Sequence, residues 1–564
     1  MNILRARTVF FFLLLFCVEP FLAARQVRPL TPPSVGVHVL AARHDLSPPL
    51  RTLKPSPDSA GSTAGEDDEE TEGGDRTARR RARAQSGIVV SDPIVQELAG
   101  SIFSLNQGVQ FDGISASSSG WVVPDTNGAI GPTQFVEFLN GVWAVYDRTN
   151  GNLLFGPEKD NLVWQGFGGV CESNNNGDPI GQYDKQAGRW VLTQHAVPPQ
   201  GQQPYQCVAV SETSDATGAF YRYAFPLPLD DLPDYPKIST WVDAYYYSAD
   251  EFLQSNLQQE IGPYVCAFDR ASMLQGLDAT SQCFQLGPAY LSLLSADWDG
   301  ATPPPSGSPE YFMSLGVNSL NLWQFHVDFV NPANTTFTGP VIVPVAAFTE
   351  ACGDGGACIP QPGVTQRLDS IGDRIMYRLA YRNFGDHESL VANHAVDANG
   401  EVGLRWYEIR SPGSNPVVYQ QQTYADRGAN RWMGSISMDH VGDIAIGYSG
   451  SSKKLYPSVR VAGRLASDPL NKLKREIIVL TGGGAEDGSY RWGDYNSLLV
   501  DPLDDCTFWF TAEYFPSNGS YNWNTHITSF SIQACTGNLN NHGGLASSDR
   551  MESIPGSRPA APRR

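Results

Sequence analysis

Residues 491–514 read RWGDYNSLLVDPLDDCTFWFTAEY. Apolar residues with high strand propensity lie on both sides of the corner Asp501-Pro502-Leu503-Asp504-Asp505, which is rich in turn-forming residues. Such a pattern is typical of two antiparallel strands joined by a tight turn. Similar patterns return about every sixty residues, and repeats of that kind indicate a solenoid or a propeller. The sequence therefore predicts an all-β fold, a seven-bladed β-propeller, with disordered N- and C-terminal flanks.

Seven hairpin units occur between residues 96 and 537, and we expect these residues to form the propeller. The units include residues 135–151, 178–223, 234–247, 311–329, 373–408, 432–449 and 491–532. Units of about sixty residues exceed the roughly 40–50 residues of a kelch or WD40 blade, so the excess must lie in loops. Propellers carry their binding sites on such loops, and we expect function on the loop face.

The composition favours many short strands and excludes one class of partner. The 564 residues include 55 Gly and 40 Pro, and only 17% are charged. Gly and Pro supply turns, which a protein built from short strands needs in number. The formal net charge of −20 argues against nucleic acid, because binding phosphate requires a basic face. The acidity fits either solubility of a secreted protein or cation binding.

Residues 1–24 have the pattern of a secretory signal peptide. Arg5 and Arg7 precede an apolar run at residues 9–18, and Leu22-Ala23-Ala24 offers a small-residue cleavage site. The apolar run is short for a membrane span, although an uncleaved anchor is an alternative. We therefore expect a secreted, extracellular protein without a stable membrane span after signal cleavage.

Residues 25–95 and 538–564 have the composition of disordered segments. The first is predicted to be a pro-region or linker, in which the acidic run Glu66-Asp67-Asp68-Glu69-Glu70 precedes the basic cluster Arg79-Arg80-Arg81-Ala82-Arg83. The basic cluster is either a solvated part of a linker or a processing site at Arg83. A mature N-terminus near Gln85 would support processing.

Eight of the nine cysteines follow the predicted signal peptide, and an even number in a secreted chain indicates disulfide bonds. Pairing in sequence order is the simplest arrangement, because each pair then falls within or beside one hairpin unit. The pairs would be Cys171 with Cys207, Cys266 with Cys283, Cys352 with Cys358, and Cys506 with Cys535. Asn334 and Asn518 begin glycosylation sequons, which matter only in a eukaryotic host.

The most polar strand pair of the chain lies at residues 372–388. Arg374, Arg378 and Arg382 recur at even spacing, so a strand would place them on one face. Arginines bind carboxylate or sulfate with two hydrogen bonds, which would suit an acidic sugar. Tyr381, His387 and Glu388 complete the candidate ligand-binding set, the last two as a possible acid/base pair. The alternative is that these arginines pair with aspartates between blades.

Aspartates recur at the predicted turns, and four of them are candidate metal ligands. Asp297 and Asp299 flank Trp298 ahead of a long loop, and Asp439 and Asp443 flank a second turn. Ca²⁺ takes six to eight oxygen ligands, more than either loop offers alone. The alternative is a structural role, in which an aspartate side chain accepts hydrogen bonds from the backbone of its turn.

The chain resembles a group of large secreted bacterial proteins from acidobacteria-like genomes. The resemblance spans about residues 117–535, and its most specific segments are residues 124–132, 368–394, 438–449 and 491–514. More distantly, the aspartate turns look like the Asp-boxes of the sialidase-like propeller superfamily. Residues 437–443, SMDHVGD, keep part of the Ser-x-Asp-x-Gly-x-Thr-Trp box. The catalytic set of sialidases cannot be assigned residue by residue.

Two functional hypotheses follow from the sequence. The first is a secreted binding module whose loop face holds an extracellular glycan or protein, because Trp and Tyr are abundant and no familiar catalytic motif is present. The alternative is a sialidase-like enzyme, hydrolase or lyase, that cleaves a glycan at an acidic sugar, with catalytic residues unassigned. Arginines that point into a central funnel beside carboxylates would favour the enzyme. Arginines that pair between blades would favour the binder.

Overall fold

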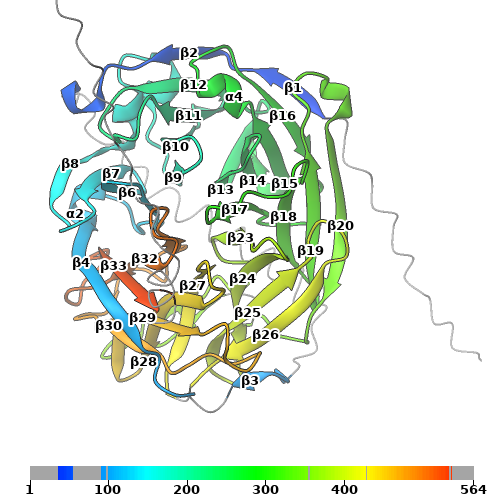
Figure 1. Ribbon diagram of the computed structural model, residues 1–564. Coiled ribbons are helices and arrows are strands. Elements are labelled where there is room, and N and C mark those ends of the chain that lie inside the picture. The colour runs from blue at the N-terminus through cyan, green and yellow to red at the C-terminus, as the bar shows by residue number, and fades with distance from the viewer. Residues whose placement is uncertain are drawn as a thin grey trace, which may run out of the picture.

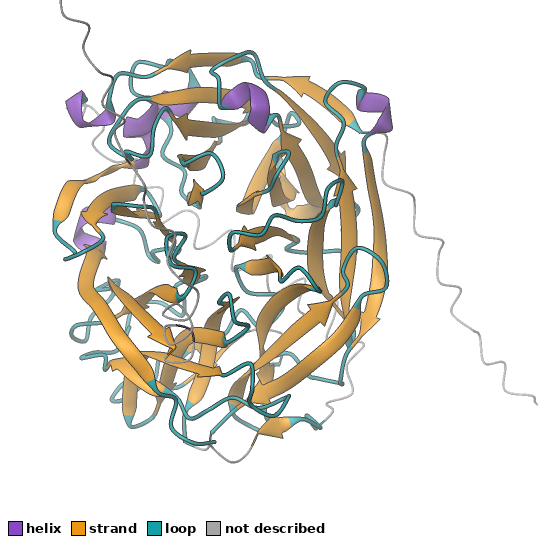
Figure 2. Cartoon of the chain, in the orientation of Figure 1, coloured by secondary structure: helices purple, strands orange, loops and turns teal. Residues whose placement is uncertain are grey.

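The computed structural model describes residues 36–54, 91–96, 100–353, 356–426, 428–532 and 535. These residues are almost entirely β, which confirms the predicted fold class at that level (Figures 1 and 2). The predicted signal peptide, the processing candidate Arg83 and residues 538–564 lie outside the described residues. Among the described residues, no helix is long and apolar enough to cross a membrane.

Consecutive antiparallel strands form four-stranded sheets, one after another along the chain. The first sheet contains β5 (Gly128–Ile130), β6 (Gln134–Leu139), β7 (Val142–Asp147) and β8 (Leu153–Lys159). The second contains β9 (Ile180–Asp184), β10 (Arg189–Ala196), β11 (Tyr205–Ser211) and β12 (Phe220–Pro226). The third contains β13 (Asp231–Thr240), β14 (Tyr245–Leu253), β15 (Asn256–Phe268) and β16 (Thr280–Gln285).

The next two sheets are joined along their first strands. The fourth contains β17 (Leu294–Asp299), β18 (Glu310–Gly316), β19 (Ser319–His326) and β20 (Thr336–Pro344). The fifth contains β23 (Leu379–Asn383), β24 (Glu388–Asp397), β25 (Val402–Arg410) and β26 (Val417–Tyr424). Because β17 pairs in parallel with β23, these strands and β3 (Val95–Gln96) form one curved nine-stranded sheet, seen at the right of Figure 1.

The last two sheets bring the chain back to its beginning. The sixth contains β27 (Asn430–Met438), β28 (Ile444–Ser452), β29 (Leu455–Arg464) and β30 (Ile477–Leu480). The seventh contains β31 (Ser497–Val500), β32 (Thr507–Tyr514), β33 (Asn524–Ile532) and, from the other end of the chain, β4 (Leu105–Ser115). An N-terminal strand thus completes the C-terminal sheet.

Short elements connect these sheets. A minor sheet pairs β21 (Ala357–Ile359) with β22 (Leu368–Asp369). The described helices are all single turns: η1 (Leu50–Thr52), α2 (Ala116–Ser119), η2 (Asp160–Trp164), α3 (Val170–Ser173), α4 (Arg270–Met273) and η3 (Pro332–Asn334).

Part of the leader that we expected to be disordered is ordered. Strand β1 (Val37–Leu40) pairs with β16, and β2 (Arg43–Leu46) pairs with β12. Arg222 holds Asp45 at 2.7 Å, and Leu50 is fully buried. Residues 36–54 and 91–95, which lie in the segment 25–95 that we predicted to be disordered, are therefore part of the described fold. A short segment gains order when it pairs with the exposed edge of an existing sheet, which composition does not reveal.

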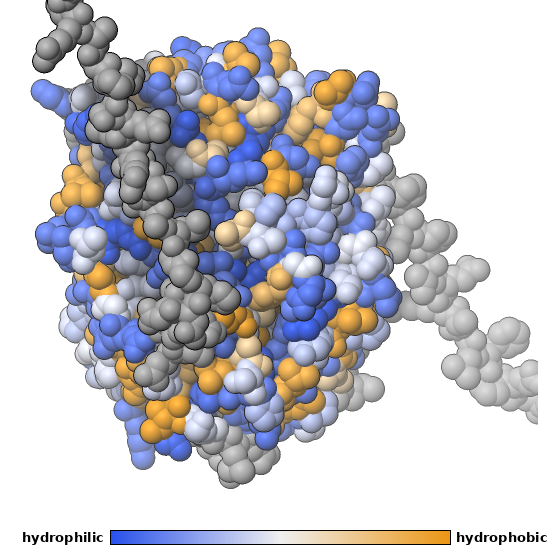
Figure 3. Space-filling view, viewed as in Figure 1, coloured by the Kyte–Doolittle hydropathy of each residue, from blue (hydrophilic) through white to orange (hydrophobic). Residues whose placement is uncertain are grey.

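The first strands of the sheets surround a common centre. They contact one another in the order β5, β9, β13, β17, β23, β27 and β31, and β31 returns to contact β5. Figure 1 labels β9, β13, β17, β23 and β27 around this centre. β5 and β31 are buried at every position, whereas the outer strands β8 and β20 are largely exposed. Exposed large hydrophobic residues belong to many separate elements, and the face in Figure 3 is mostly hydrophilic with scattered hydrophobic residues.

Four disulfide bonds join the cysteines in sequence order, which confirms the predicted pairing. They link Cys171 to Cys207, Cys266 to Cys283, Cys352 to Cys358, and Cys506 to Cys535. Cys266 and Cys283 face each other in the register of β15 and β16. Disulfide bonds persist in oxidising compartments, so they are consistent with an extracellular protein.

Candidate functional site

The centre of the ring has two chemically different ends. One end, which we call the arginine end, gathers residues of the first strands, of the turns after them and of the segment before β23: Lys185, Asp297, Asp299, Arg378, Arg382 and Asp505. The other, the tyrosine end, gathers residues that precede the first strands or lie within β13: Asp125, Asp178, Tyr235, Lys237, Arg374, Asp494 and Tyr495. Tyr377 lies between them, because its hydroxyl accepts a hydrogen bond from Gln182 on β9 at 2.8 Å, while its ring contacts Tyr495 at 5.7 Å.

The guanidinium of Arg378 is the main cation of the arginine end, and aspartates take up its hydrogen bonds. Arg378 donates to Asp297 at 2.9 Å and to Asp299 at 2.6 Å, both on β17, and is itself 1% exposed. Burial alone would raise the pKa of Asp299, but the Arg378 guanidinium holds that pKa below its ordinary value. A buried guanidinium between two carboxylates has no charge left for a ligand.

The other cations at this end are also paired. Arg382 makes two hydrogen bonds to Asp505, at 2.7 and 2.9 Å. Lys185 donates to the carbonyl of Trp298 and lies 4.5 Å from its ring centroid, and burial lowers the pKa of Lys185 to about 8. A cavity of 30 Å³ lies among these groups, lined by residues of five first strands and the turns after them. That volume admits one or two water molecules but not a sugar ring.

The three candidate arginines do not form a row on one strand. β23 begins only at Leu379, so Arg374 and Arg378 lie in the segment that precedes it. Arg374 pairs with Asp373 at 3.0 Å and lies 4.7 Å from the ring centroid of Tyr235, at the tyrosine end. The expectation of one strand face is wrong, because regular alternation requires an extended, paired strand, and residues 370–378 pair with no sheet.

The remaining ligand-binding candidates lie at the turn from β23 to β24. Tyr381 donates to Glu388 at 2.6 Å, and its ring packs on Tyr311. His387 contacts Asp386 at 2.7 Å and stacks on Phe384 rather than facing Glu388. The structure therefore places these residues in separate local pairs.

At the tyrosine end, several loops have the same backbone conformation just before a first strand or within it. Asp125, Asp178 and Asp494 have φ values of 49°, 48° and 57°, and Tyr235 has φ of 55°. Aspartate tolerates this left-handed region, since its short side chain bonds the local backbone, whereas a bulky tyrosine is strained there. Strained residues of this kind concentrate at binding and catalytic sites.

A lysine lies between two tyrosine rings at this end. The ammonium of Lys237 lies 3.7 Å from the ring centroid of Tyr235 and 3.9 Å from that of Tyr495, and the two rings are perpendicular. Lys237 also donates to the carbonyl of Pro236 at 3.0 Å. Burial lowers the pKa of Lys237 to about 8. Cation–π contacts thus hold the ammonium in place while leaving part of its donor capacity unused.

Several buried polar atoms at the tyrosine end have no hydrogen-bond partner among the described residues. They are one carboxylate oxygen of Asp125 and the hydroxyls of Tyr235 and Tyr495. Burial raises the pKa of Asp125 well above its ordinary value, and the nearby Asp178 and Asp494 add to the shift. Because an unsatisfied buried polar group costs about 1–3 kcal/mol, three such atoms together require an explanation.

An aromatic side chain flanks Asp178. Trp121 is half-buried and packs so closely on Gly177 and Gly141 that a Cβ atom at either glycine would lie within 3.2 Å of its ring. The same loop is tied to β11 by the disulfide bond of Cys171, and the backbone of Asp178 donates to Asn140 at 2.7 Å. The partly exposed indole therefore packs against Gly177, the residue that precedes Asp178.

The tyrosine end carries no excess of positive charge. Asp494 pairs with Arg491 at 2.5 Å, and Asp373 pairs with Arg374 at 3.0 Å. Lys237 then faces both Asp125 and Asp178, and the raised pKa of Asp125 favours its protonated form. This end therefore has no excess cation that would attract an anion.

The candidate metal ligands have structural partners. Asp297 and Asp299 hold Arg378, as described above. One oxygen of Asp439 accepts hydrogen bonds from the backbone of Val441 and Asp443, at 3.0 and 2.9 Å. Burial raises the pKa of both Asp439 and Asp443. Metal binding by these residues stays a prediction.

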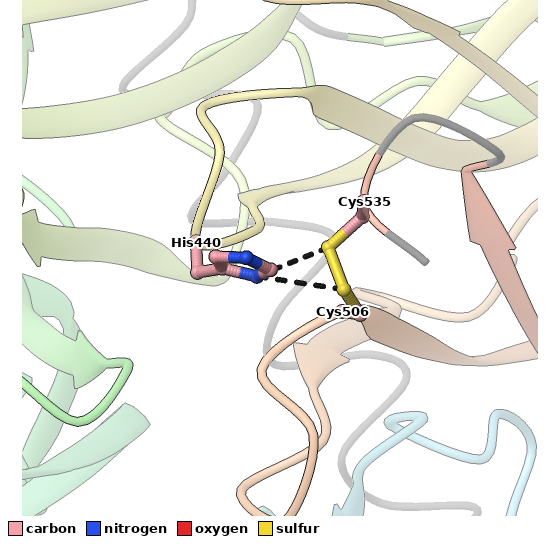
Figure 4. A group of neighbouring side chains, drawn as sticks. All are labelled: His440, Cys506 and Cys535. Atoms are coloured by element: carbon pink, nitrogen blue, oxygen red, sulfur yellow. Dashed lines mark hydrogen bonds between the residues drawn. A yellow bond between two sulfur atoms is a disulfide. The ribbon is translucent and has the colours of Figure 1, made fainter. Parts of the chain in front are cut away.

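A histidine and two cysteines also lie close together. The ligand atoms of His440, Cys506 and Cys535 lie within 4.8 Å of one another (Figure 4). The two sulfur atoms are bonded to each other, as Figure 4 shows, so they are not thiolates. Thiolates are the form in which cysteine binds metal, and this group is therefore not a metal site as it stands. The sequon residues Asn334 and Asn518 are both exposed.

Sequence reasoning missed the tyrosine end as a site. Its aspartates lie in Asp125-Thr126-Asn127, Asp178-Pro179, Asp373-Arg374 and Gly493-Asp494-Tyr495-Asn496, each ahead of a first strand. That repetition was a usable signal. Our interpretation of repeated aspartates as turn residues concerned those at the strand corners, such as Asp439, and did not extend to Asp125, one oxygen of which has no partner among the described residues.

The comparisons with known proteins are limited to distant structures. No protein-family model and no curated protein matches the sequence. The solved structures with similar architecture include Drosophila Semaphorin 1b, extracellular domains 1-2, with 7% identity and a TM-score of 0.36, over 79% of this chain and 89% of that chain. The N-terminal domain of Nup159 has 8% identity and a TM-score of 0.35, over 79% and 100%.

A GH43 beta 1,3 galactosidase has 11% identity and a TM-score of 0.28, over 77% of this chain and 95% of that chain. Because these TM-scores are low, the likenesses carry no information on the ligand or activity of this chain. The resemblances to secreted bacterial proteins and to the sialidase-like superfamily stay predictions.

Proposed function

We propose that this chain is a secreted seven-bladed β-propeller that binds an uncharged saccharide at its tyrosine end. Four-stranded antiparallel repeats support the blade count, as do the closed circuit of contacts among first strands and the completion of the last sheet by β4. Four disulfide bonds and the signal-like N-terminus support secretion.

The observation that carries the proposal is the group of unpartnered polar atoms on Asp125, Tyr235 and Tyr495. Sugar hydroxyls donate to carboxylates and both donate to and accept from phenols, so a saccharide satisfies these atoms. Tyrosine and tryptophan also offer flat apolar faces, which suit the C–H face of a sugar ring. Trp121, half-buried beside Asp178, is the candidate stacking platform.

The charges favour a neutral sugar over an acidic one. Arg378 and Arg382 are taken up by Asp297, Asp299 and Asp505, so no guanidinium of the arginine end is available to a carboxylate. The tyrosine end has no excess positive charge that would attract an anion. The hypothesis of an acidic-sugar ligand therefore lacks the free arginines on which it depended. The hypothesis of glycan binding does not depend on them and is kept.

The test is binding of the secreted protein to a panel of neutral, amino-bearing and acidic polysaccharides. Asp125→Asn should weaken binding of the retained neutral glycan at least about tenfold, because it replaces the carboxyl group whose unpartnered oxygen would bond a sugar hydroxyl. The matched control is Asp439→Asn, another buried aspartate with a raised pKa, which should bind as the parent does. Retention of acidic glycans alone, or equal binding by both variants, would refute the proposal; retention of none would point to a protein partner.

A second candidate function is glycan cleavage at the same end. Asp125 has a pKa raised by burial and by neighbouring carboxylates, as a general acid requires, and Asp178 lies close enough to contribute to that shift. The enzyme hypothesis predicts new oligosaccharides, detected by mass spectrometry, whose formation is lost in Asp125→Asn while glycan retention persists. Retention without products supports the binding module.

A further inference from the structure

The hairpin of β14 and β15 carries a second group of buried oxygen atoms, apart from the tyrosine end. Tyr247 and Glu251 lie four residues apart on β14 and therefore share one face of the sheet. Asp231 on β13 pairs with Leu253, and Tyr264 on β15 pairs with Ala249, so both belong to that same face. Three neighbouring strands thus contribute two carboxyls and two phenols to one surface.

Glu251 is fully buried, and neither of its carboxyl oxygens has a hydrogen-bond partner among the described residues. The hydroxyl of Tyr247 is also buried and unpartnered. The charge of Glu251 raises the pKa of Tyr247 more than the charge of any other residue does, yet no hydrogen bond joins the two. Their polar atoms are therefore close but separated, and each lacks the partner that a buried oxygen needs.

The charges around Glu251 are all of one sign. The charges of Asp231, Asp250 and Asp234 raise the pKa of Glu251, and no lysine or arginine is among the charged groups that shift it. Asp250 is satisfied by the backbone and hydroxyl of Ser292, at 2.8 Å each. Asp231 is 5% exposed and makes no side-chain hydrogen bond among the described residues. Buried carboxylates without a cation are costly, and a bound metal ion removes that cost.

We propose that Asp231 and Glu251 bind a divalent cation with a preference for oxygen ligands, Ca²⁺, at this face of the β13–β14–β15 sheet. Two carboxylates supply up to four oxygens, and water or backbone carbonyls complete the six to eight that Ca²⁺ takes. The ligand set contains no nitrogen or sulfur, which disfavours zinc and copper. With two protein carboxylates, the affinity should fall in the range of about 10⁻⁴–10⁻³ M that is usual for extracellular calcium modules.

The test is Ca²⁺ binding by the secreted, disulfide-bonded protein, measured by isothermal titration and by terbium luminescence excited through tyrosine. The parent should bind Ca²⁺ and unfold at a higher temperature in 5 mM Ca²⁺ than in chelator, because a ligand of the folded state stabilises it. Glu251→Gln keeps the shape and removes the charge, and it should weaken Ca²⁺ binding at least about tenfold, since even a change in the outer shell of a metal site costs that much. Its thermal shift with Ca²⁺ should vanish.

Glu310→Gln is the matched control, since Glu310 is also a fully buried glutamate with one unpartnered oxygen, on β18. It should retain Ca²⁺ affinity, terbium emission and the thermal shift. If Glu251→Gln does not fold, Asp231→Asn at the strand edge replaces it, with the same expected loss. No Ca²⁺ binding by the parent, or equal binding by the parent and both site variants, would overturn the proposal and leave Glu251 as a protonated buried acid.

Discussion

The two ends of the ring centre contain similar charged and polar residues, but these are paired at one end and partly without hydrogen-bond partners at the other. At the arginine end, Arg378 is buried between Asp297 and Asp299, and every charge has a partner. At the tyrosine end, Asp125, Tyr235 and Tyr495 keep polar atoms without partners. Charged residues alone therefore do not identify a site in this protein. Unmet hydrogen-bonding capacity does, because pairing removes a group from the reach of a ligand.

The largest expected effect concerns Arg378. Arg378→Met removes the cation that hydrogen-bonds two buried carboxylates, and it should lower the free energy of unfolding by about 3–5 kcal/mol. Urea denaturation measures the loss. Arg51→Ala is the control, since Arg51 and Asp215 form a half-exposed pair, and it should cost less than about 1 kcal/mol. Equal losses in the two variants would show that the arginine end is not the structural clamp we describe.

The next effect concerns the disulfide bond beside the arginine end, where Cys506 follows the Asp505 that holds Arg382. The bond from Cys506 to Cys535 closes a loop of 29 residues, so replacing both cysteines with alanine should cost about 3–4 kcal/mol. The bond from Cys352 to Cys358 spans 6 residues, and the same change there should cost about 2 kcal/mol. Denaturation of both double variants measures the difference. The reverse order would contradict an effect set by loop length.

The third effect is the dependence of stability on pH that the two buried lysines cause. Burial lowers the pKa of Lys185 and of Lys237 to about 8, from 10.5 in the unfolded chain. Between pH 8 and pH 10.5 the unfolded state therefore binds more protons than the folded state, and stability rises with pH. Lys237→Met and Lys185→Met should each reduce that rise.

The two lysine variants should both lose stability near pH 7, where urea denaturation measures the loss. Lys185→Met leaves the Trp298 carbonyl without its donor, and Lys237→Met does the same to the Pro236 carbonyl. Lys453→Met, at an exposed lysine, is the control for both. If stability still rises with pH in the variant that carries both Lys185→Met and Lys237→Met, the lysines are not the source of the rise.

The smallest effect distinguishes two tyrosines. Tyr381→Phe removes a hydrogen bond to Glu388 and should cost about 1–2 kcal/mol. Tyr235→Phe removes a hydroxyl without a partner, so its stability should change by less than about 0.5 kcal/mol while glycan affinity falls about tenfold. Thermal unfolding and glycan retention measure the two properties. A large loss of stability in Tyr235→Phe would show that the hydroxyl is structurally engaged.

Local patterns in the sequence predicted those features that depend on nearby residues. Strand and turn propensities predicted the β fold, and each pair of cysteines lies within 36 residues, so sequence order was enough for the disulfide bonds. The pairing of Arg378 with Asp297 was foreseen as the alternative to a ligand role, since buried arginines and aspartates commonly pair. The row of arginines failed because residues 370–378 do not form a strand.

Long-range features could not be predicted in this way. Asn127 hydrogen-bonds Tyr377 across 250 positions, and Tyr235 meets Tyr495 only when the ring closes. Each aspartate at the tyrosine end looks like an ordinary turn residue in its own segment. Only the fold shows which of them retain an unpartnered oxygen. Residues 36–54 were misjudged for the same reason, since their order comes from sheet edges more than 170 residues away.

The pairing of β4 with β33 sets the order of events when the protein is made. Val109 and Ser529 form a hydrogen bond across 420 positions, so β4 leaves the ribosome long before its partner exists. During synthesis at roughly 5–20 residues per second, the edge of β4 waits at least about twenty seconds. The ring therefore closes only when nearly the whole chain has emerged. A polypeptide that stops short of β33 keeps β4 unpaired, with an open strand edge prone to aggregate.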